Sequence, residues 1–320
     1  MTVSRGRVTR GVASVLMMTL LAACELEEIT VVNVEDVVVA EIFLSLEADP
    51  DENEVRAFLH RTVGVPPEHS SVLSAATVTV VRSDGAMLSL RPRSFDDCVL
   101  SAAEGALGAC FVSEPGEAQM VVPGDRLEVT VELPDGSTIT GGTSAPGEFE
   151  VVGRPTMCRL NADVLVPVTW TSSEGAWAYL NETSIRGLRE ALAPENIEVD
   201  VGYDPLYLLG LSISDADTMI VFPSEFGLFN RFELDQAVSV RLQRGLPVGS
   251  SAEVTITAVD RNYVNWVRGG RFNPSGQVRV PSLSGGGTGV FGSSIVRRFE
   301  VFVTDDPTTT LPDCPGLTSF

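Results

Sequence analysis

Residues 126–140 read RLEVTVELPDGSTIT, and this stretch decides the fold class. Between Arg126 and Leu133 apolar residues alternate with charged or polar ones, which is the period of a strand with one buried face. Pro134-Asp135-Gly136 then supplies the residues of a tight turn before a second short alternating run. The stretch therefore predicts a β-hairpin.

The same pattern recurs along the chain and predicts an all-β protein. A second hairpin is expected over 76–90, turned by Ser83-Asp84-Gly85, and a third from the alternating runs 238–242 and 254–258. Helical periodicity is scarce, with short helices expected at 184–192 and 263–268. Short strands at this spacing, without alternating helices, favour immunoglobulin-like β-sandwiches.

The length of 320 residues allows two domains of ordinary size. Turn residues cluster between 144 and 155, after a completed hairpin, and mark the expected boundary. We therefore expect one sandwich over 37–152, a second over 155–305, and a polar tail over 306–320.

The N-terminal segment has the pattern of a bacterial lipoprotein signal. Three arginines precede an apolar run over 12–21 that is too short to span a bilayer, and Leu21-Ala22-Ala23-Cys24 closes it. This pattern predicts a signal peptide over 1–23, acylation of Cys24, and a tether over 24–36 that anchors the body to a membrane. An ordinary secretory signal, or an anchor that stays attached, is the alternative.

The acidic charge limits the partners. The formal net charge is −21 at pH 7, which repels phosphate backbones, so we expect no nucleic-acid partner.

Four further cysteines, an even number in an exported setting, predict disulfides. Three connectivities are possible, and we favour the one that pairs neighbours: Cys98 with Cys110, and Cys158 with Cys314. A zinc site is disfavoured because no C-x-x-C pair exists and neither histidine has zinc-site spacing from a cysteine.

Catalytic and ligand-binding motifs are absent or incomplete in the sequence. His60 and His69 accompany no hydrolase or metalloprotease pattern. The acidic run 49–54 resembles a calcium loop but lacks the glycine and the bidentate glutamate, so a solvated loop is favoured. Asp215 and Asp217 are likewise interpreted as solvated residues and not as metal ligands. The triple glycine 285–287 lacks the lysine and the helix of a phosphate loop. We expect no metal, no cofactor and no enzymatic activity.

Aromatic residues gather in the second half of the chain. Trp170, Trp177 and Tyr179 lie close together, with Tyr203 and Tyr207 further on. Exposed, they would suit stacking against a carbohydrate or peptide, but aromatic side chains are common in sandwich cores, and we favour a core role.

Several segments together resemble the outer-membrane lipoproteins of domain of unknown function family 4249, which are often encoded beside TonB-dependent receptors. The matching parts, besides Cys24 and the acidic residues after it, are the opening strand 37–46, the strand 76–80, the stretch 121–131, AVDRNY at 258–263, and PSLSGGGTGVFG at 281–292. The chain departs from the pattern at Leu283-Ser284, where Asn-Ile is usual. The resemblance implies two β-domains near an outer-membrane transporter, and it carries over no catalytic residue.

These observations predict a lipid-anchored outer-membrane lipoprotein that acts as a non-enzymatic accessory or ligand-binding partner of a TonB-dependent transporter. A structural or adhesive envelope module is the alternative, and an uncharacterised hydrolase is a third hypothesis. Glu25, Glu27 and Glu28, directly after the cysteine, resemble a surface-export signal and predict exposure at the cell surface.

Overall fold

The structure is a computed structural model that describes residues 36–62, 72–98, 108–153, 155–212, 214–223, 236–268, 280–306 and 308–314. The predicted signal peptide, Cys24, the acidic residues after it and His69 lie outside these residues. Asp36–Phe320 form one compact unit. The all-β class is confirmed, since strands dominate and the helices are short.

In the first half of the chain, the described residues form eight strands and three short 3-10 helices. The strands are β1 (Val38–Leu46), β2 (Glu54–Arg61), β3 (Thr77–Arg82), β4 (Met87–Ser89), β5 (Arg91–Arg93), β6 (Gly108–Val112), β7 (Arg126–Glu132) and β8 (Thr138–Ser144). The helices are η2 (Pro50–Glu52), η3 (Phe95–Asp97) and η4 (Glu117–Met120).

The second half contributes the remaining elements. The strands are β9 (Met157–Leu160), β10 (Val166–Thr169), β11 (Ala178–Arg186), β12 (Leu206–Leu211), β13 (Met219–Phe222), β14 (Ser251–Val259), β15 (Leu283–Gly285) and β16 (Gly287–Val303). The helices are α3 (Leu188–Leu192), η5 (Ala193–Glu195), η6 (Val201–Tyr203), α4 (Gln236–Leu242) and α5 (Arg261–Arg268).

Two of the predicted hairpins are confirmed. β7 and β8 pair antiparallel around the Pro134-Asp135-Gly136 turn, and β3 pairs with β4 around 83–85. Gly136 has φ +85°, a conformation that glycine adopts without steric cost. Along β7, Leu127, Val129 and Val131 are buried while their neighbours are more exposed. Burial of each such side chain contributes about 1.5–3 kcal/mol.

The third predicted hairpin is wrong. Residues 236–242 form the helix α4, in which Val238, Arg241 and Leu242 are buried, as expected for a helix that covers a core. The partner run forms β14, which instead pairs with β11 and β16. Tertiary packing has overridden the β-propensity of the valines.

The predicted helix over 184–192 is wrong in its first half. β11 continues through Arg186, and α3 begins only at Leu188. Between them Gly187 takes φ +76°, and its amide donates to the Asp204 carboxylate at 2.9 Å. The helix expected at 263–268 is confirmed as α5, which begins two residues earlier.

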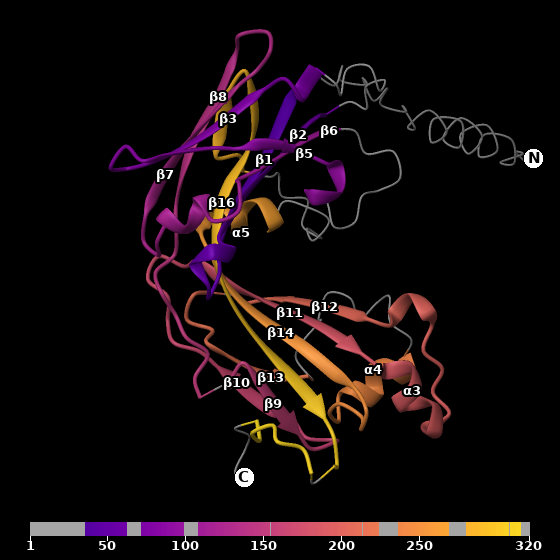
Figure 1. Ribbon diagram of the computed structural model, residues 1–320. Coiled ribbons are helices and arrows are strands. Elements are labelled where there is room, and N and C mark those ends of the chain that lie inside the picture. The colour runs from indigo at the N-terminus through magenta and orange to yellow at the C-terminus, as the bar shows by residue number, and fades with distance from the viewer. Residues whose placement is uncertain are drawn as a thin grey trace, which may run out of the picture. The chain divides into compact units, whose positions relative to one another are not determined.

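A single sheet runs through both halves, and β16 joins its parts (Figure 1). The strand order in one part is β4-β3-β7-β8-β15-β16-β1-β2-β6-β5, and in the other β11 lies between β12 and β14, while β14 and β9 both pair with β16. β16 pairs parallel with β1 over 287–295 and antiparallel with β14 over 294–302. Strands β10 and β13 form a separate two-stranded sheet.

The core is continuous, and one cluster of buried apolar side chains includes residues from Val38 to Cys314. The C-terminal segment 283–295 pairs with β1 and β8, which belong to the first half of the chain. The sheet therefore does not follow the sequence order of the two expected domains. Their division near residue 152 remains a prediction.

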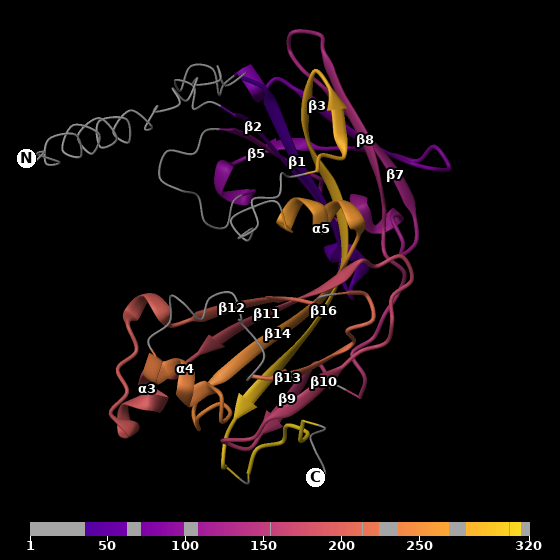
Figure 2. The same ribbon diagram turned by 180° about the vertical axis from the view of Figure 1, so that it is seen from behind.

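Helix α5 lies beside β16 (Figures 1 and 2), on the sheet face opposite to this core, because Val39 and Val290 alternate with the core residues of their strands. Trp266 packs there with Val39, Val290 and Phe43. Gly292 permits the approach, because a Cβ at this position would lie 3.2 Å from the Tyr263 Cβ and 3.3 Å from the Phe43 ring. The helix thus borders one end of the face on which a cleft opens.

Candidate functional site: a polar cleft on the shared sheet

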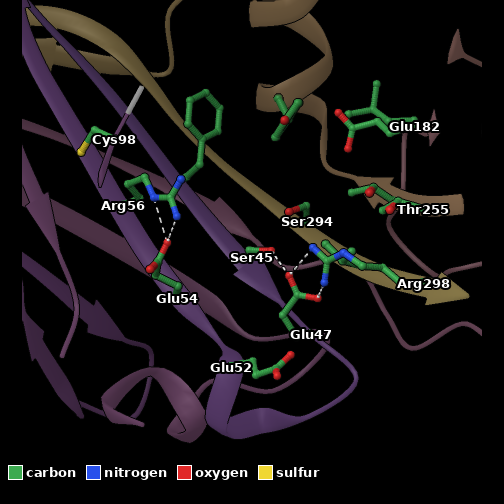
Figure 3. A pocket seen from close by; sticks show the side chains of 15 residues that line it. Ser45, Glu47, Glu52, Glu54, Arg56, Cys98, Glu182, Thr255, Ser294 and Arg298 are labelled. Carbon is green, nitrogen blue, oxygen red and sulfur yellow. Dashed lines mark hydrogen bonds and ion pairs between the residues drawn. The ribbon is translucent and has the colours of Figure 1, made fainter. Parts of the chain in front are cut away.

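A cleft with a volume of about 620 Å³ opens on the face of the sheet that bears α5 (Figure 3). Its floor is formed by the adjacent strands β2, β1, β16, β14 and β11. Alternate residues of each strand point into it, as the two-residue period requires. The lining residues are Phe43, Ser45, Glu47, Glu52, Glu54, Arg56, Cys98, Leu180, Glu182, Thr255, Thr257, Tyr263, Ser294, Val296 and Arg298.

Arg298 on β16 is paired with Glu47 at the end of β1. Its guanidinium contacts both carboxylate oxygens, with Nη2 3.1 Å from Oε1. The Glu47 side chain is 10% exposed, and the Ser45 hydroxyl also donates to its Oε1 at 3.0 Å. The positive charge of Arg298 is therefore largely neutralised within the cleft wall.

Arg56 is paired with its neighbour on the same strand. Its Nε donates to the Glu54 Oε1 at 2.8 Å, and both side chains are more than a third exposed. An exposed pair of this kind contributes little to stability, about 0–1 kcal/mol, but it does neutralise the second arginine of the cleft.

Glu182 differs from the other glutamates that line the cleft floor. It lies mid-strand on β11, opposite Thr255 of β14 and Leu209 of β12. Its side chain reaches the water of the cleft, yet the surrounding walls desolvate it and raise its pKa, with the charge of Arg298 opposing the shift. Among the described residues it has no hydrogen-bond or ion-pair partner.

Tyr263 forms the aromatic end of the cleft together with Phe43. The two ring centroids lie 5.0 Å apart at an interplanar angle of 56°. Burial raises the pKa of the Tyr263 phenol to about 12, with smaller contributions from the charges of Glu182 and Asp260. The phenol therefore stays protonated at neutral pH.

The position of α5 is fixed by Asp260, which is 5% exposed. Its Oδ1 accepts from the amides of Tyr263 at 2.9 Å and Ser293 at 3.2 Å, and its Oδ2 accepts from the Thr143 hydroxyl at 2.7 Å. Burial raises the pKa of Asp260, and these hydrogen bonds oppose the shift. One carboxylate thus joins α5, β8 and β16.

The cysteines pair as the sequence favours. Cys98–Cys110 and Cys158–Cys314 are both disulfides, with Cα–Cα distances of 5.6 and 4.8 Å. Cys98 also lines the cleft, while Cys158 and Cys314 join β9 to the tail.

The other predicted residues do not converge on a catalytic arrangement. His60 on β2 is partly buried and stacks on Phe58, with the two ring centroids 5.4 Å apart. The His60 Nε2 lies 3.8 Å from the Glu41 Oε1. Asp217 accepts from the Ser214 amide at 3.1 Å within a turn. In the described part of the chain, no group of three or more His, Cys, Asp or Glu side chains could hold a metal ion.

The acidic run 49–54 has a role that the sequence reading missed. Asp49 caps η2 by accepting a hydrogen bond from the Asp51 amide at 3.0 Å. Asn53 is buried, and its Oδ1 accepts a hydrogen bond from the Glu47 amide at 2.8 Å. Glu52 and Glu54 line the cleft. The run therefore forms part of the cleft wall in addition to an exposed loop.

The aromatic prediction holds for two side chains and is wrong for two others. Trp170 and Tyr179 are buried, with ring centroids 5.3 Å apart. Trp177 and Tyr207 are exposed, and Trp177 carries the Arg261 guanidinium 4.9 Å from its ring centroid. None of these four lines the cleft.

Sequence reasoning missed Glu182, Arg298 and Tyr263 as site residues. A signal existed at Glu182, because it is the one charged residue inside the run 178–185, AYLNETSI. Its neighbours from β16 and α5 come from sequence positions far away, so no local pattern joins them.

No helix in the described ranges is long and apolar enough to cross a membrane.

Comparison with known proteins gives little for this fold. No family model and no curated protein matches the chain. Among solved structures, trypsin-activated α2-macroglobulin from Escherichia coli is similar over 85% of this chain, with 10% identity and a TM-score of 0.22. The chain spans 16% of the length of that protein. A likeness at this level carries no argument about function.

Proposed function

We propose that this protein is a lipid-anchored lipoprotein of the outer membrane, acting as a non-enzymatic accessory or ligand-binding partner of a TonB-dependent transporter. The observation that carries the proposal is Leu21-Ala22-Ala23-Cys24 behind a basic and then apolar segment. Support comes from the two disulfides, which persist in oxidising compartments, and from the resemblance to family 4249 lipoproteins.

The binding role is favoured over catalysis by the composition of the cleft. Its described lining offers carboxylates, hydroxyls and two paired arginines, but no histidine. Its Ser45 hydroxyl donates to Glu47, a carboxylate that Arg298 already binds. Such a surface suits recognition of a polar ligand more than nucleophilic chemistry.

A finer proposal concerns the fold: two immunoglobulin-like sandwiches over 37–152 and 155–305. Support in the second half comes from two sheets, one with β11 and β14 and one with β10 and β13, around a buried Trp170 and Tyr179. The proposal has to accommodate 283–295, which would complete the first sandwich from the far end of the chain.

The anchoring proposal is tested by mass and by fractionation. The membrane form should lack the first 23 residues and carry acyl chains on Cys24, and a Cys24→Ala variant should leave the membrane fraction. Wild-type protein without lipid, or Cys24→Ala protein wholly in membranes, would contradict it.

The partner proposal is tested by co-purification of the tagged protein from detergent-solubilised outer membranes. A transporter recovered from wild-type cells in stoichiometric amount, and absent when an unrelated lipoprotein is tagged, supports the accessory role. Recovery of envelope polymers without a transporter would favour the structural or adhesive alternative.

A further inference from the structure

The charges of the cleft do not balance. Its described lining contains four glutamates and two arginines. Arg298 is held by Glu47 and Arg56 by Glu54, so both positive charges are already compensated. Glu52 at the rim and Glu182 on the floor remain, and Figure 3 shows Glu182 on the opposite side of the cleft from Arg56 and Glu54.

Glu182 carries a desolvation cost that the charge of Arg298 relieves only in part and that no hydrogen bond or ion pair from a described residue relieves. The cost shows in the raised pKa of its carboxyl, and the positive charge closest to it, Arg298, is bound by Glu47. A carboxylate in this situation gains more from an incoming cation than a fully hydrated one does, because part of its water has already been removed.

Aromatic rings stand at the end of the same cleft. Phe43 and Tyr263 are partly buried and in contact, and both line the cavity together with Glu182. The negative face of an aromatic ring attracts ammonium and guanidinium groups, and its apolar body contacts their alkyl chains. The cleft therefore combines a cavity, an unpaired carboxylate and an aromatic pair.

We propose that this cleft binds an organic cation, an alkylammonium or guanidinium group, with Glu182 as its direct counter-ion and Phe43 and Tyr263 as its aromatic contacts. The inference rests on the ligand-binding part of the proposed function and names its ligand class. The cation can be carried by a free polyamine or by a basic peptide, since both present the same group.

Other ligand classes fit the cleft less well. An anion would have to displace Glu47 from Arg298 or Glu54 from Arg56, and would meet the unpaired Glu182. A bare metal ion would find too few ligands, as no cluster of three suitable side chains occurs in the residues that the structure describes. A neutral sugar would leave the charge of Glu182 uncompensated.

The pH dependence follows from the groups around Glu182. Arg298 of β16 and Tyr263 of α5 line the cleft beside Glu182. Glu253 lies diagonally opposite Glu182 on β14, and Glu47 of β1 lies beyond Arg298. Because the pKa of Glu182 is raised, cation binding is lost on acidification at a higher pH than for an ordinary glutamate.

The test is titration calorimetry on the full chain in a non-ionic detergent. The probes are spermidine and the peptide Gly-Arg-Gly, with citrate and maltose as anionic and neutral comparisons. We expect saturable binding of at least one cationic probe, reduced about tenfold or more in Glu182→Gln and about threefold in Phe43→Leu. Spermidine alone would indicate a free polyamine, and the peptide alone a basic chain segment.

Glu128→Gln is the matched control, because it removes the same charge from an exposed position on β7. It should bind the probes within about twofold of wild type. Glu182→Gln is expected to fold, since the substitution removes a desolvated charge, and its unfolding temperature is measured alongside. Should it fail to fold, Phe43→Leu carries the comparison.

Three results would overturn the proposal: no binding of either cation, equal binding by wild type and Glu182→Gln, or preference for citrate or maltose. Membrane attachment of the same variants is measured in parallel. A wild-type protein that attaches to the membrane but binds neither cation would overturn this inference alone, whereas a wild-type protein that fails to attach contradicts the anchoring proposal.

Discussion

Removal of the two disulfides should destabilise the protein by different amounts, and the longer loop should dominate. Cys158–Cys314 closes a loop with a sequence separation of 156 residues, whereas Cys98–Cys110 closes one of 12. In the chain-entropy model, the cost of losing a cross-link rises with the logarithm of the loop length. The model gives about 5 kcal/mol for the long loop and about 3 kcal/mol for the short one.

Local contacts should hold the tail in place when the long bridge is absent. The Arg159 amide donates to the Pro312 carbonyl and the Cys314 amide to the Arg159 carbonyl, each at 2.7 Å. Arg159 also binds Asp313, with Nε 2.8 Å from Oδ1. We therefore expect the Cys158→Ala, Cys314→Ala double variant to fold natively but to unfold at lower denaturant concentration.

The assay is urea unfolding of this double variant, of Cys98→Ala with Cys110→Ala, and of the wild type, each followed by far-UV circular dichroism. The long-loop variant should lose about 2 kcal/mol more than the short-loop variant. An equal loss, or a larger loss from the short loop, would refute the reasoning. It would mean that packing around the sulfur atoms, rather than chain entropy, sets the contribution of each bridge.

Arg298→Met should destabilise the protein by about 1–3 kcal/mol, because it leaves the Glu47 carboxylate, which is 10% exposed, without its cation. Adding Glu47→Gln in a double-mutant cycle should restore much of the lost stability. Gly292→Val should lower the free energy of unfolding by about 1–3 kcal/mol and change the near-UV circular dichroism, because the new side chain displaces α5 from β16. Gly202→Ala is the control: its new Cβ meets nothing closer than 3.7 Å, so its stability should stay within about 0.5 kcal/mol of wild type. Burial raises the pKa of Asp260, so this group contributes stability at low pH that is lost as the pH rises through its folded pKa. Urea unfolding should therefore show Asp260→Asn gaining stability relative to the wild type as the pH rises above the ordinary aspartate pKa of 3.8. A constant difference between those two proteins would contradict the shift.

The sequence predicts two of the three hairpins correctly because the information for them is local. The turn at 134–136 and the alternation of β7 specify each other over fifteen residues, and the structure agrees. The helix α4 was beyond the same reasoning, since Val238 and Val240 favour a strand on their own and only the core that buries Val238 and Leu242 decides for a helix. In β11 the pattern of apolar residues is ambiguous until Gly187 ends the strand.

The cleft is still less predictable, because its members are scattered. Glu47, Glu182 and Arg298 come together only because β1 and β14 pair with β16 and β11 pairs with β14. Periodicity indicates that each residue lies on one face of its strand, but not which strands are neighbours. Strand order is a long-range property, and a single sequence carries little information about it.

The parallel pairing of β1 with β16 also limits the order in which the strands can pair as the chain is synthesised. Val38 lies opposite Gly287, so the first strand has no partner on that edge until almost the whole chain has left the ribosome. Such distant pairing is slow, and a waiting strand edge invites contact with other chains. A polypeptide with this strand order gains from delaying collapse until the segment 287–295 has been synthesised. A ribosome stall or truncation before residue 287 would leave β1 with an open edge and yield a product prone to aggregation.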